Sequence, residues 1–132
     1  MIEIKGYSQL NKILWEQKDS DKVMMLYFST SWCGPCKKLK ERIEDEKDKI
    51  ELVEVLLIDC DLEDNEEIVE DWKIDCLPTQ IFVHLEDKNV VKDDRIEGFD
   101  WIKLIMSYEK IIENRNDYLN IDISNEFDKK GE

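Results

Sequence analysis

Two cysteines in the sequence SWCGPCK, residues 31–37, are the side chains best suited to chemistry. Cys33 and Cys36 are separated only by Gly34 and Pro35. A pair at this spacing can bind a metal, form a structural disulfide, or exchange electrons through thiol–disulfide exchange. The surrounding sequence bears on these three interpretations.

The pair stands between a predicted strand and a predicted helix. The continuous apolar run VMMLYF at 23–28 is typical of a strand covered on both faces, and a charged helix over roughly 34–49 follows it. Cys33 then lies at the positive end of the helix macrodipole, where backbone N–H groups stabilise a thiolate. Cys36 lies one turn further along, close enough for an intramolecular disulfide. This position favours a redox role.

The neighbours of the cysteines fit that role. We expect Trp32 to shield the pair and Gly34 to permit close approach by a partner chain. Pro35 falls in the first helical turn, where its missing N–H has no cost.

The other two interpretations find less support. A zinc site usually needs four ligands, and the remaining candidates Cys60, Cys76 and His84 form no ligand pair at the usual spacing. We therefore expect no metal. His84 falls in the middle of a predicted strand, which indicates a half-buried sheet residue rather than the base of a Cys–His hydrolase. A static disulfide fits poorly with the start of a helix and with a reducing compartment.

Composition limits the classes of function. The chain has 132 residues, enough for one domain, and a net charge of −14, which disfavours nucleic-acid binding because phosphates are repelled. No apolar run reaches the ~20 residues that span a membrane. The first residues have no basic segment followed by an apolar one, so we expect a cytoplasmic protein without a signal peptide or membrane contact.

The remaining apolar patterns predict an α/β domain. We expect antiparallel pairing of the last two strands across the turn EDKN, and N-caps at Ser8, at Asp64 or Asn65, and at Asp100. The alternation implies a mixed sheet with helices on both faces. The predicted strands are 2–4, 23–28, 52–59, 80–85 and 90–97, and the predicted helices are 8–17, 34–49, 64–72 and 100–114.

The arrangement of these motifs resembles the thioredoxin family. SWCGPCK follows a buried strand, the sequence LPT at 77–79 precedes the fourth strand, and Gly98 follows the fifth. The resemblance covers roughly residues 2–112 and implies the thioredoxin fold, a three-layer α/β/α arrangement with a central mixed five-stranded sheet of order 1-3-2-4-5. We assign a thioredoxin-like domain to 1–112 and an acidic C-terminal extension to 113–132.

The resemblance also implies roles for individual residues. Cys33 is the attacking thiol, and Cys36 is the resolving thiol that releases the mixed disulfide. The other implied features are a cis proline at Pro78 facing the cysteines, backbone pairing of Leu77 with an extended substrate, and Asp61 near Trp32.

Three positions depart from the family pattern. Tyr27 stands where the family usually has a buried Asp that helps to move the proton of the resolving thiol, and Leu57 replaces the lysine that accompanies it. The exchange avoids the cost of burying charged groups. Because tyrosine has an ordinary pKa of about 10, it is a poor base, and we expect slower resolution unless water or another Asp or Glu serves. Glu41 replaces a helix-kinking proline and predicts a straighter helix.

The two other cysteines receive separate interpretations. Cys60 ends a buried strand and is expected to be an inert small hydrophobic residue. Cys76 precedes Leu77 and Pro78, where a thiol can be modified or can link two molecules on oxidation. We interpret Cys76 as a regulatory thiol or a passive residue.

The sequence therefore predicts a thiol–disulfide oxidoreductase of the thioredoxin type. Its cysteines are the redox centre, so no bound cofactor is expected. The resemblance implies disulfide-containing protein substrates, a thioredoxin-reductase-type electron donor and a monomer, with an oxidation-linked dimer as a further state. The alternative is a binding or scaffold module of the same fold that uses its thiols little.

Overall fold

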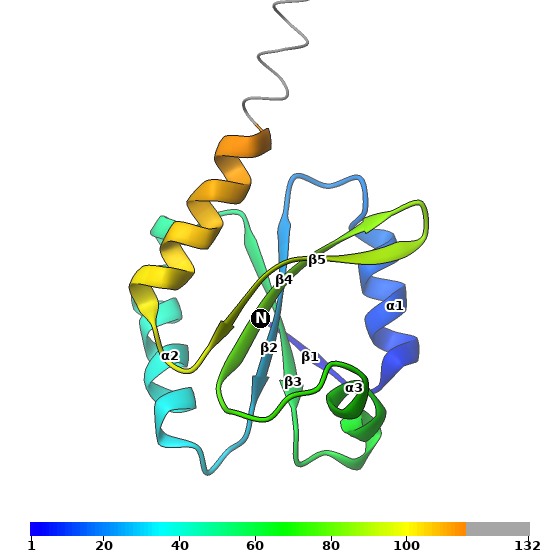
Figure 1. The fold of residues 1–132 in the computed structure, drawn as a ribbon, viewed down its shortest axis with the longest axis vertical. Helices are drawn as coiled ribbons and strands as arrows, with labels where there is room; N and C mark the ends of the chain where they lie inside the picture. The colour runs from blue at the N-terminus through cyan, green and yellow to red at the C-terminus, as the bar shows by residue number, and fades with distance from the viewer. Residues whose placement is uncertain (116–132) are drawn as a thin grey trace, which may run out of the picture.

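The central element of the protein is a five-stranded sheet (Figure 1). The structure is a computed structural model, and it describes residues 1–115. The strands are β1 (Ile2–Ile4), β2 (Val23–Ser29), β3 (Val53–Asp59), β4 (Thr79–Glu86) and β5 (Asn89–Glu97). Their order in the sheet is β1-β3-β2-β4-β5, as the family resemblance predicted.

The pairing of the strands makes the sheet mixed. β3 is parallel to both β1 and β2, whereas β4 is antiparallel to β2 and to β5. β4 and β5 form the predicted hairpin, in whose turn Asp87 and Lys88 have positive φ angles. β2 lies at the centre and is buried almost throughout, which explains its continuous apolar sequence.

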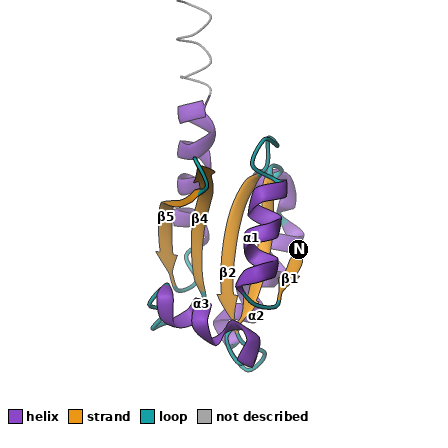
Figure 2. Ribbon diagram, turned by 90° about the vertical axis from the view of Figure 1, so that its right-hand side faces the viewer, coloured by secondary structure: helices purple, strands orange, loops and turns teal. Residues whose placement is uncertain are grey.

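Helices cover both faces of the sheet, which gives the predicted three layers (Figure 2). α1 (Tyr7–Glu16) and α3 (Glu66–Asp71) lie on one side, and α2 (Gly34–Asp45) and a helix over 101–115 lie on the other (Figure 1). Each side has its own hydrophobic cluster, because alternate residues of the strands point to opposite faces. The cluster under α2 and the 101–115 helix contains Tyr27, Leu39 and Trp101.

Several helix ends differ from the predictions. The predicted helix 34–49 ends at Asp45 and is followed by the 3-10 helix η1 (Lys47–Ile50), while α2 runs unbroken through Glu41. α3 is preceded by a second 3-10 turn, η2 (Glu63–Asn65). The prediction that Ser8 caps α1 is wrong, because the N-cap is Gly6 with φ of 86°, where a side chain would be strained.

Asn65 also departs from its predicted capping role. It occupies the N-cap position of α3, but its side chain makes no cap hydrogen bond, and Asp64 belongs to η2. Instead, Asn65 is fully buried, donates to the carbonyls of Ile4 and Asp59, and accepts the N–H of Gly6 at 2.8 Å. Its amide thus joins the segment 4–6 to the end of β3.

The last described helix has the predicted N-cap and apolar stripe. Asp100 accepts the N–H of Lys103 at 3.0 Å. Trp101, Leu104 and Tyr108 are buried against the sheet. The helix continues through residue 115, and the predicted tail interpretation of 113–132 lies mostly outside the described residues.

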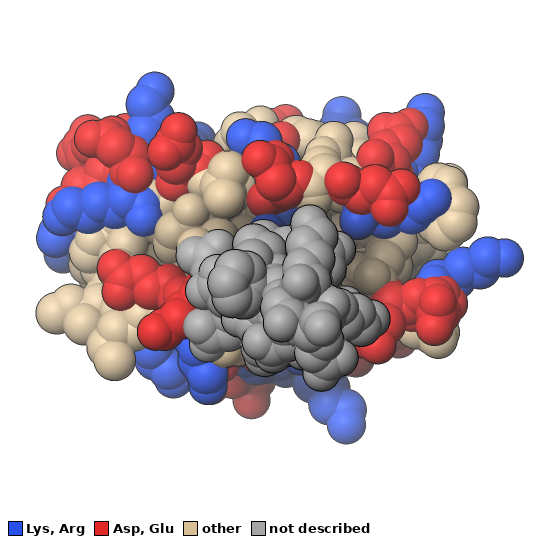
Figure 3. Space-filling view, turned by 90° about the horizontal axis from the view of Figure 1, so that it is seen from above, with Lys and Arg blue, Asp and Glu red and all other residues tan. Residues whose placement is uncertain are grey.

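The acidic excess is not gathered on the face near the end of this helix. Figure 3 shows Lys and Arg side chains interspersed with Asp and Glu there. None of the helices among residues 1–115 is long and apolar enough to cross a membrane.

Candidate active site

Cys33 and Cys36 form a disulfide at the point where β2 leads into α2. Cys33 is the N-cap of α2, and its sulfur accepts the backbone N–H of Cys36 at 3.3 Å. Pro35 lies in the first turn, as predicted from its missing N–H. The Cα atoms of the two cysteines are 5.2 Å apart, an ordinary distance for a disulfide. The backbone therefore holds both sulfurs within bonding range.

Both cysteines of the disulfide are buried. Cys33 is 6% exposed and Cys36 is 2% exposed. Gly34 and Pro35 are exposed beside them. A Cβ atom added to Gly34 would meet nothing within 4 Å, so packing within the chain does not require glycine there.

Trp32 directly precedes Cys33 in the chain and is held by Asp61. The indole Nε1 donates to Asp61 Oδ2 at 2.7 Å. Trp32 is 70% exposed, so most of its ring faces solvent. A large apolar side chain fixed in this way beside a disulfide is suited to contact a partner.

The loop before β4 lies at the same end of the sheet. Phe28 pairs with Thr79, so the residues after β2 and those before β4 are neighbours. The Leu77–Pro78 peptide bond is cis, and the carbonyl of Pro78 accepts the N–H of Gly98 at 2.7 Å. These contacts fix the loop that carries Leu77 at the end of the sheet where β2 leads into α2.

Tyr27 and Leu57 occupy paired positions below the disulfide. They are direct partners in the β2–β3 register. The Tyr27 hydroxyl donates to the backbone carbonyl of Cys36, and the side chain is 1% exposed. Burial raises the pKa of Tyr27, because the charged phenolate is poorly solvated there. Tyr27 is consequently a structural hydrogen-bond donor, and even less of its basic form, the phenolate, is present at neutral pH than its ordinary pKa would give.

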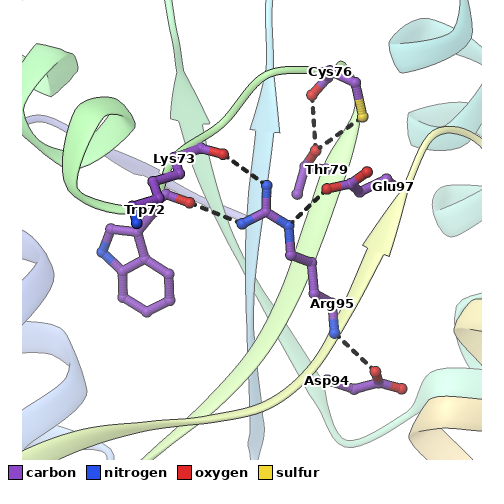
Figure 4. A network of polar contacts seen from close by, with 7 residues as sticks. All are labelled: Trp72, Lys73, Cys76, Thr79, Asp94, Arg95 and Glu97. Atoms are coloured by element: carbon purple, nitrogen blue, oxygen red, sulfur yellow. Dashed lines mark hydrogen bonds and ion pairs between the residues drawn. The ribbon is translucent and has the colours of Figure 1, made fainter.

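A residue that the sequence interpretation missed, Arg95, anchors the segment leading to Cys76 (Figure 4). Its guanidinium donates to the carbonyls of Trp72 and Lys73 at 2.8 and 2.9 Å and to Glu97 Oε1 at 3.0 Å. Arg95 is on β5, whereas Trp72 and Lys73 follow α3, so no local pattern could have revealed the contact.

Cys76 is half-buried at the end of that segment. Its sulfur lies 3.6 Å from Thr79 Oγ1 (Figure 4), and potential ligand atoms of Asp75, Cys76 and Glu97 lie within 4.8 Å of one another. Glu97 already binds Arg95, which places a positive charge beside this group. This positive charge disfavours a metal cation at the cluster, so no metal remains our expectation.

The other predicted residues have ordinary surroundings. Burial and the carboxylates of Asp59 and Asp61 raise the pKa of the Cys60 thiol to about 11, which fits an inert thiol. His84 is half-buried on β4, and its Nδ1 lies 2.9 Å from Asp93 Oδ2. This is the sheet position that the sequence predicted.

Comparison with known proteins agrees with the fold and the cysteine pair. The family model described as Thioredoxin matches residues 8–116. The chain belongs to the thioredoxin family. A thioredoxin H-type from Fagopyrum esculentum is 31% identical over 74% of this chain and 79% of its own length. The X-ray structure of Fasciola hepatica thioredoxin has a TM-score of 0.68 and 27% identity, covering 83% of this chain and 98% of that one.

Other thioredoxins match over a smaller share of their length. Thioredoxin H8 from Arabidopsis thaliana is 37% identical over 47% of this chain, but the match spans only 42% of that protein. Thioredoxin membership and the Cys33–Cys36 disulfide together identify the described domain as a thiol–disulfide oxidoreductase domain.

Proposed function

We propose that this protein reduces disulfide bonds in other proteins, with Cys33 as the attacking thiol and Cys36 as the resolving thiol. The observation that carries the proposal is the position of Cys33 as the N-cap of α2, with Cys36 within disulfide distance one turn later. The roles of the two cysteines come from the family and from this geometry together.

In the first step, the Cys33 thiolate attacks one sulfur of the substrate disulfide. The other substrate sulfur leaves as a thiolate and takes a proton from solvent, which leaves a mixed disulfide on Cys33. The N–H of Cys36, 3.3 Å from the Cys33 sulfur, and the positive end of α2 favour the attacking thiolate.

In the second step, the Cys36 thiolate attacks the sulfur of Cys33. The Cys33–Cys36 disulfide forms, and the remaining substrate sulfur leaves as a thiol once it is protonated. The substrate gains two electrons, and the protein loses two. Since the cysteines carry the electrons, the cycle requires no bound cofactor.

The surface around the disulfide suits an extended protein segment. Trp32, held by Asp61, offers an exposed apolar face, and Gly34 leaves room for a backbone. We propose that the backbone of Leu77, fixed beside the cis Pro78, pairs with the substrate segment. Main-chain pairing of this kind accepts many sequences.

The same proposal includes the setting and the partners. A thioredoxin-reductase-type enzyme supplies the electrons, and the protein acts as a cytoplasmic monomer without binding nucleic acid or membranes. The net charge of −14 supports the absence of nucleic-acid binding. Cys76 is half-buried, and oxidation of this thiol would link two molecules.

Insulin reduction tests the proposal. Wild-type protein with dithiothreitol as electron source should accelerate insulin precipitation, Cys33→Ser should abolish the effect, and Cys36→Ser should accumulate a mixed disulfide. Cys60→Ala is the matched control, because Cys60 is not part of the disulfide and packs against the hydrophobic cluster under α1 and α3. Activity without either active-site thiol would overturn the proposal.

The alternative is a binding or scaffold module that uses its thiols little. Tyr27 and Leu57, in place of the family's buried polar pair, are the observation that favours it. Equal insulin precipitation by wild type and Cys33→Ser, at a rate no higher than with dithiothreitol alone, would support the module. Titration of the Cys33–Cys36 pair against glutathione then determines whether an active protein reduces or forms disulfides.

A further inference from the structure

A pocket of about 300 Å³, lined by both polar and apolar side chains, lies beside Cys36, between α2 and the sheet. Its lining includes Tyr27, Thr30, Cys36, Lys40, Leu57 and Asp59. The volume is sufficient for several water molecules. The resolving cysteine therefore borders a space that water can enter.

Strand pairing places Asp59 in this pocket. Ser29 pairs with Asp59 just as Tyr27 pairs with Leu57, and residues two apart on a strand share a face. Asp59 thus lies on the same face as Leu57, one pleat nearer the end of the sheet where α2 begins. Among the described residues that line the pocket, it is the only carboxylate.

The hydrogen bonds of Asp59 leave one carboxylate oxygen available to accept a proton. Its Oδ1 accepts the N–H of Asp61 at 3.0 Å, and within residues 1–115 no hydrogen bond or ion pair engages Oδ2. Thr30 is buried, and its hydroxyl has no partner among the described residues. A water molecule in the pocket would satisfy Thr30 and could also reach the carboxylate.

Tyr27, in contrast, does not compete for the proton of Cys36. Its hydroxyl hydrogen is directed at the carbonyl of Cys36, and burial makes its phenolate unfavourable. The charged groups facing the pocket from α2 are Lys37 and Lys40, both exposed cations that cannot accept a proton while charged.

We propose that Asp59 accepts the proton of the Cys36 thiol through water in this pocket during the resolving step. This inference rests on the proposed function, because it concerns the second half of that cycle. The proton moves from Cys36 to water and from water to Asp59. The resulting Cys36 thiolate attacks the Cys33 sulfur, and the departing substrate thiolate takes up a proton from solvent. Asp59 then returns its proton to solvent.

The two steps can be separated with 5,5′-dithiobis(2-nitrobenzoate), a small disulfide that releases a coloured thiolate at each step. With reduced protein in excess, the first release reports attack by Cys33 and the second reports resolution by Cys36. A second phase whose rate does not depend on protein concentration identifies the intramolecular reaction. Stopped-flow traces from pH 5 to 9 give both rates for each variant.

Asp59→Asn is the deciding variant, because the amide oxygen can still accept the Asp61 N–H but cannot take a proton. We expect the second phase to slow by at least about tenfold near pH 7, and by up to the roughly 100-fold that is typical for loss of a general base. The first phase should change less than about twofold. The deficit should shrink toward pH 9 as solvent base takes over. Asp59→Glu should restore part of the rate, and Asp48→Asn, an exposed acid in η1, should leave both phases unchanged.

The sign of the effect separates this role from simple electrostatics. Removing a nearby negative charge by itself favours the Cys36 thiolate and would speed the second phase. A faster or unchanged second phase in Asp59→Asn, or equal slowing of both phases at every pH, would overturn the inference while leaving the proposed function in place. Absence of any second release by the wild type would overturn both.

Discussion

The hydroxyl of Tyr27 donates a hydrogen bond to the backbone carbonyl of Cys36, directly beneath the redox disulfide. A tyrosine therefore supports the first turn of α2 at the position where related proteins usually have a buried acid. The bond holds the resolving cysteine in place but offers it no base. Structure and proton transfer are thus assigned to different residues in this protein.

Tyr27→Phe should separate these two roles. Loss of the hydrogen bond should lower the free energy of unfolding by about 0.5–1.5 kcal/mol in urea titration. The pH profile of the second phase with the small aromatic disulfide should keep its shape, because the hydroxyl is not the proton acceptor. A loss of the second phase comparable to that expected for Asp59→Asn would instead identify the tyrosine as the acceptor.

Tyr27→Asp should add a base at the cost of stability. A carboxylate at this buried position has a raised pKa, so the folded state holds its proton more tightly than the unfolded state. The loss of stability should be smallest below pH 4, near the ordinary pKa of Asp, and should grow as pH rises. In an Asp59→Asn background, Tyr27→Asp should recover the second phase. Urea titrations at pH 4 and pH 7 and the two-phase assay test both expectations, and equal destabilisation at the two pH values would contradict the first.

Arg95→Lys should loosen the loop before the cis proline. A lysine amine cannot reach the carbonyls of Trp72 and Lys73 together, as the guanidinium does in Figure 4. We expect a loss of about 1–2 kcal/mol in urea titration, below the full value for such bonds because the side chain is partly exposed. The KM for insulin should rise while the first phase with the small disulfide stays unchanged.

Arg42→Lys is the control for Arg95→Lys. Arg42 lies on α2, where it binds Glu46 and stacks near Trp101. The same substitution there should leave the KM for insulin unchanged. If both variants raised the KM equally, the effect would come from replacing a surface arginine by lysine in general and not from loosening of the loop before Pro78.

The sequence predicted the elements of this fold better than their ends. Apolar runs such as 23–28 identify buried strands directly, and the order of the strands followed from the family resemblance of the motifs. The cap at Gly6 and the buried contacts of Asn65 could not be predicted, because these contacts join residues far apart in the chain. Local preference for Ser8 as a cap was weaker than these tertiary contacts.

In the candidate active site too, the local residues were predictable from the sequence and the residues brought together by strand pairing were not. Cys33, Cys36 and Pro35 form a local motif whose geometry depends on a single strand–helix junction. Asp59 lines the same pocket as the resolving cysteine only because β2 pairs with β3. The alternation of Leu57 and Asp59 along one strand face was the available signal, and it becomes informative only once the register is known.

Cys60 should react slowly despite its partial exposure. Burial and two neighbouring carboxylates raise its pKa from 9.0 to about 11, so about 100-fold less thiolate is present at neutral pH. Iodoacetamide should modify Cys60 about 100-fold more slowly in the folded, disulfide-containing protein than in the urea-unfolded chain. The rate should rise about tenfold per pH unit until about pH 11.

Peptide mass spectrometry distinguishes Cys60 from Cys76 in that experiment. Asp61→Asn should speed the labelling of Cys60, because one of the two carboxylates that disfavour its thiolate is removed. Equal labelling rates in the folded and unfolded protein at neutral pH would contradict the assignment of Cys60 as an inert thiol.

Tyr7 should make the stability of the protein depend on alkaline pH. Its hydroxyl donates to Asp71 Oδ2 at 2.8 Å, and burial together with Asp71 raises its pKa from 10.0 to about 12. Below pH 10 the phenol is protonated in both the folded and unfolded states. Between pH 10 and about 12 only the unfolded state loses the proton, so the stabilisation from Tyr7 declines over that range.

Comparison of wild type with Tyr7→Phe isolates this effect, because the other ionisable groups titrate in both proteins. The difference in free energy of unfolding between them should be constant up to pH 10 and should then shift against the wild type toward pH 12. Asp71→Asn should weaken the shift, since the carboxylate that opposes ionisation of Tyr7 is gone. A difference that stayed constant from pH 8 to 12 would mean that Tyr7 ionises equally in both states, and that the contact between α1 and the end of α3 does not hold its proton.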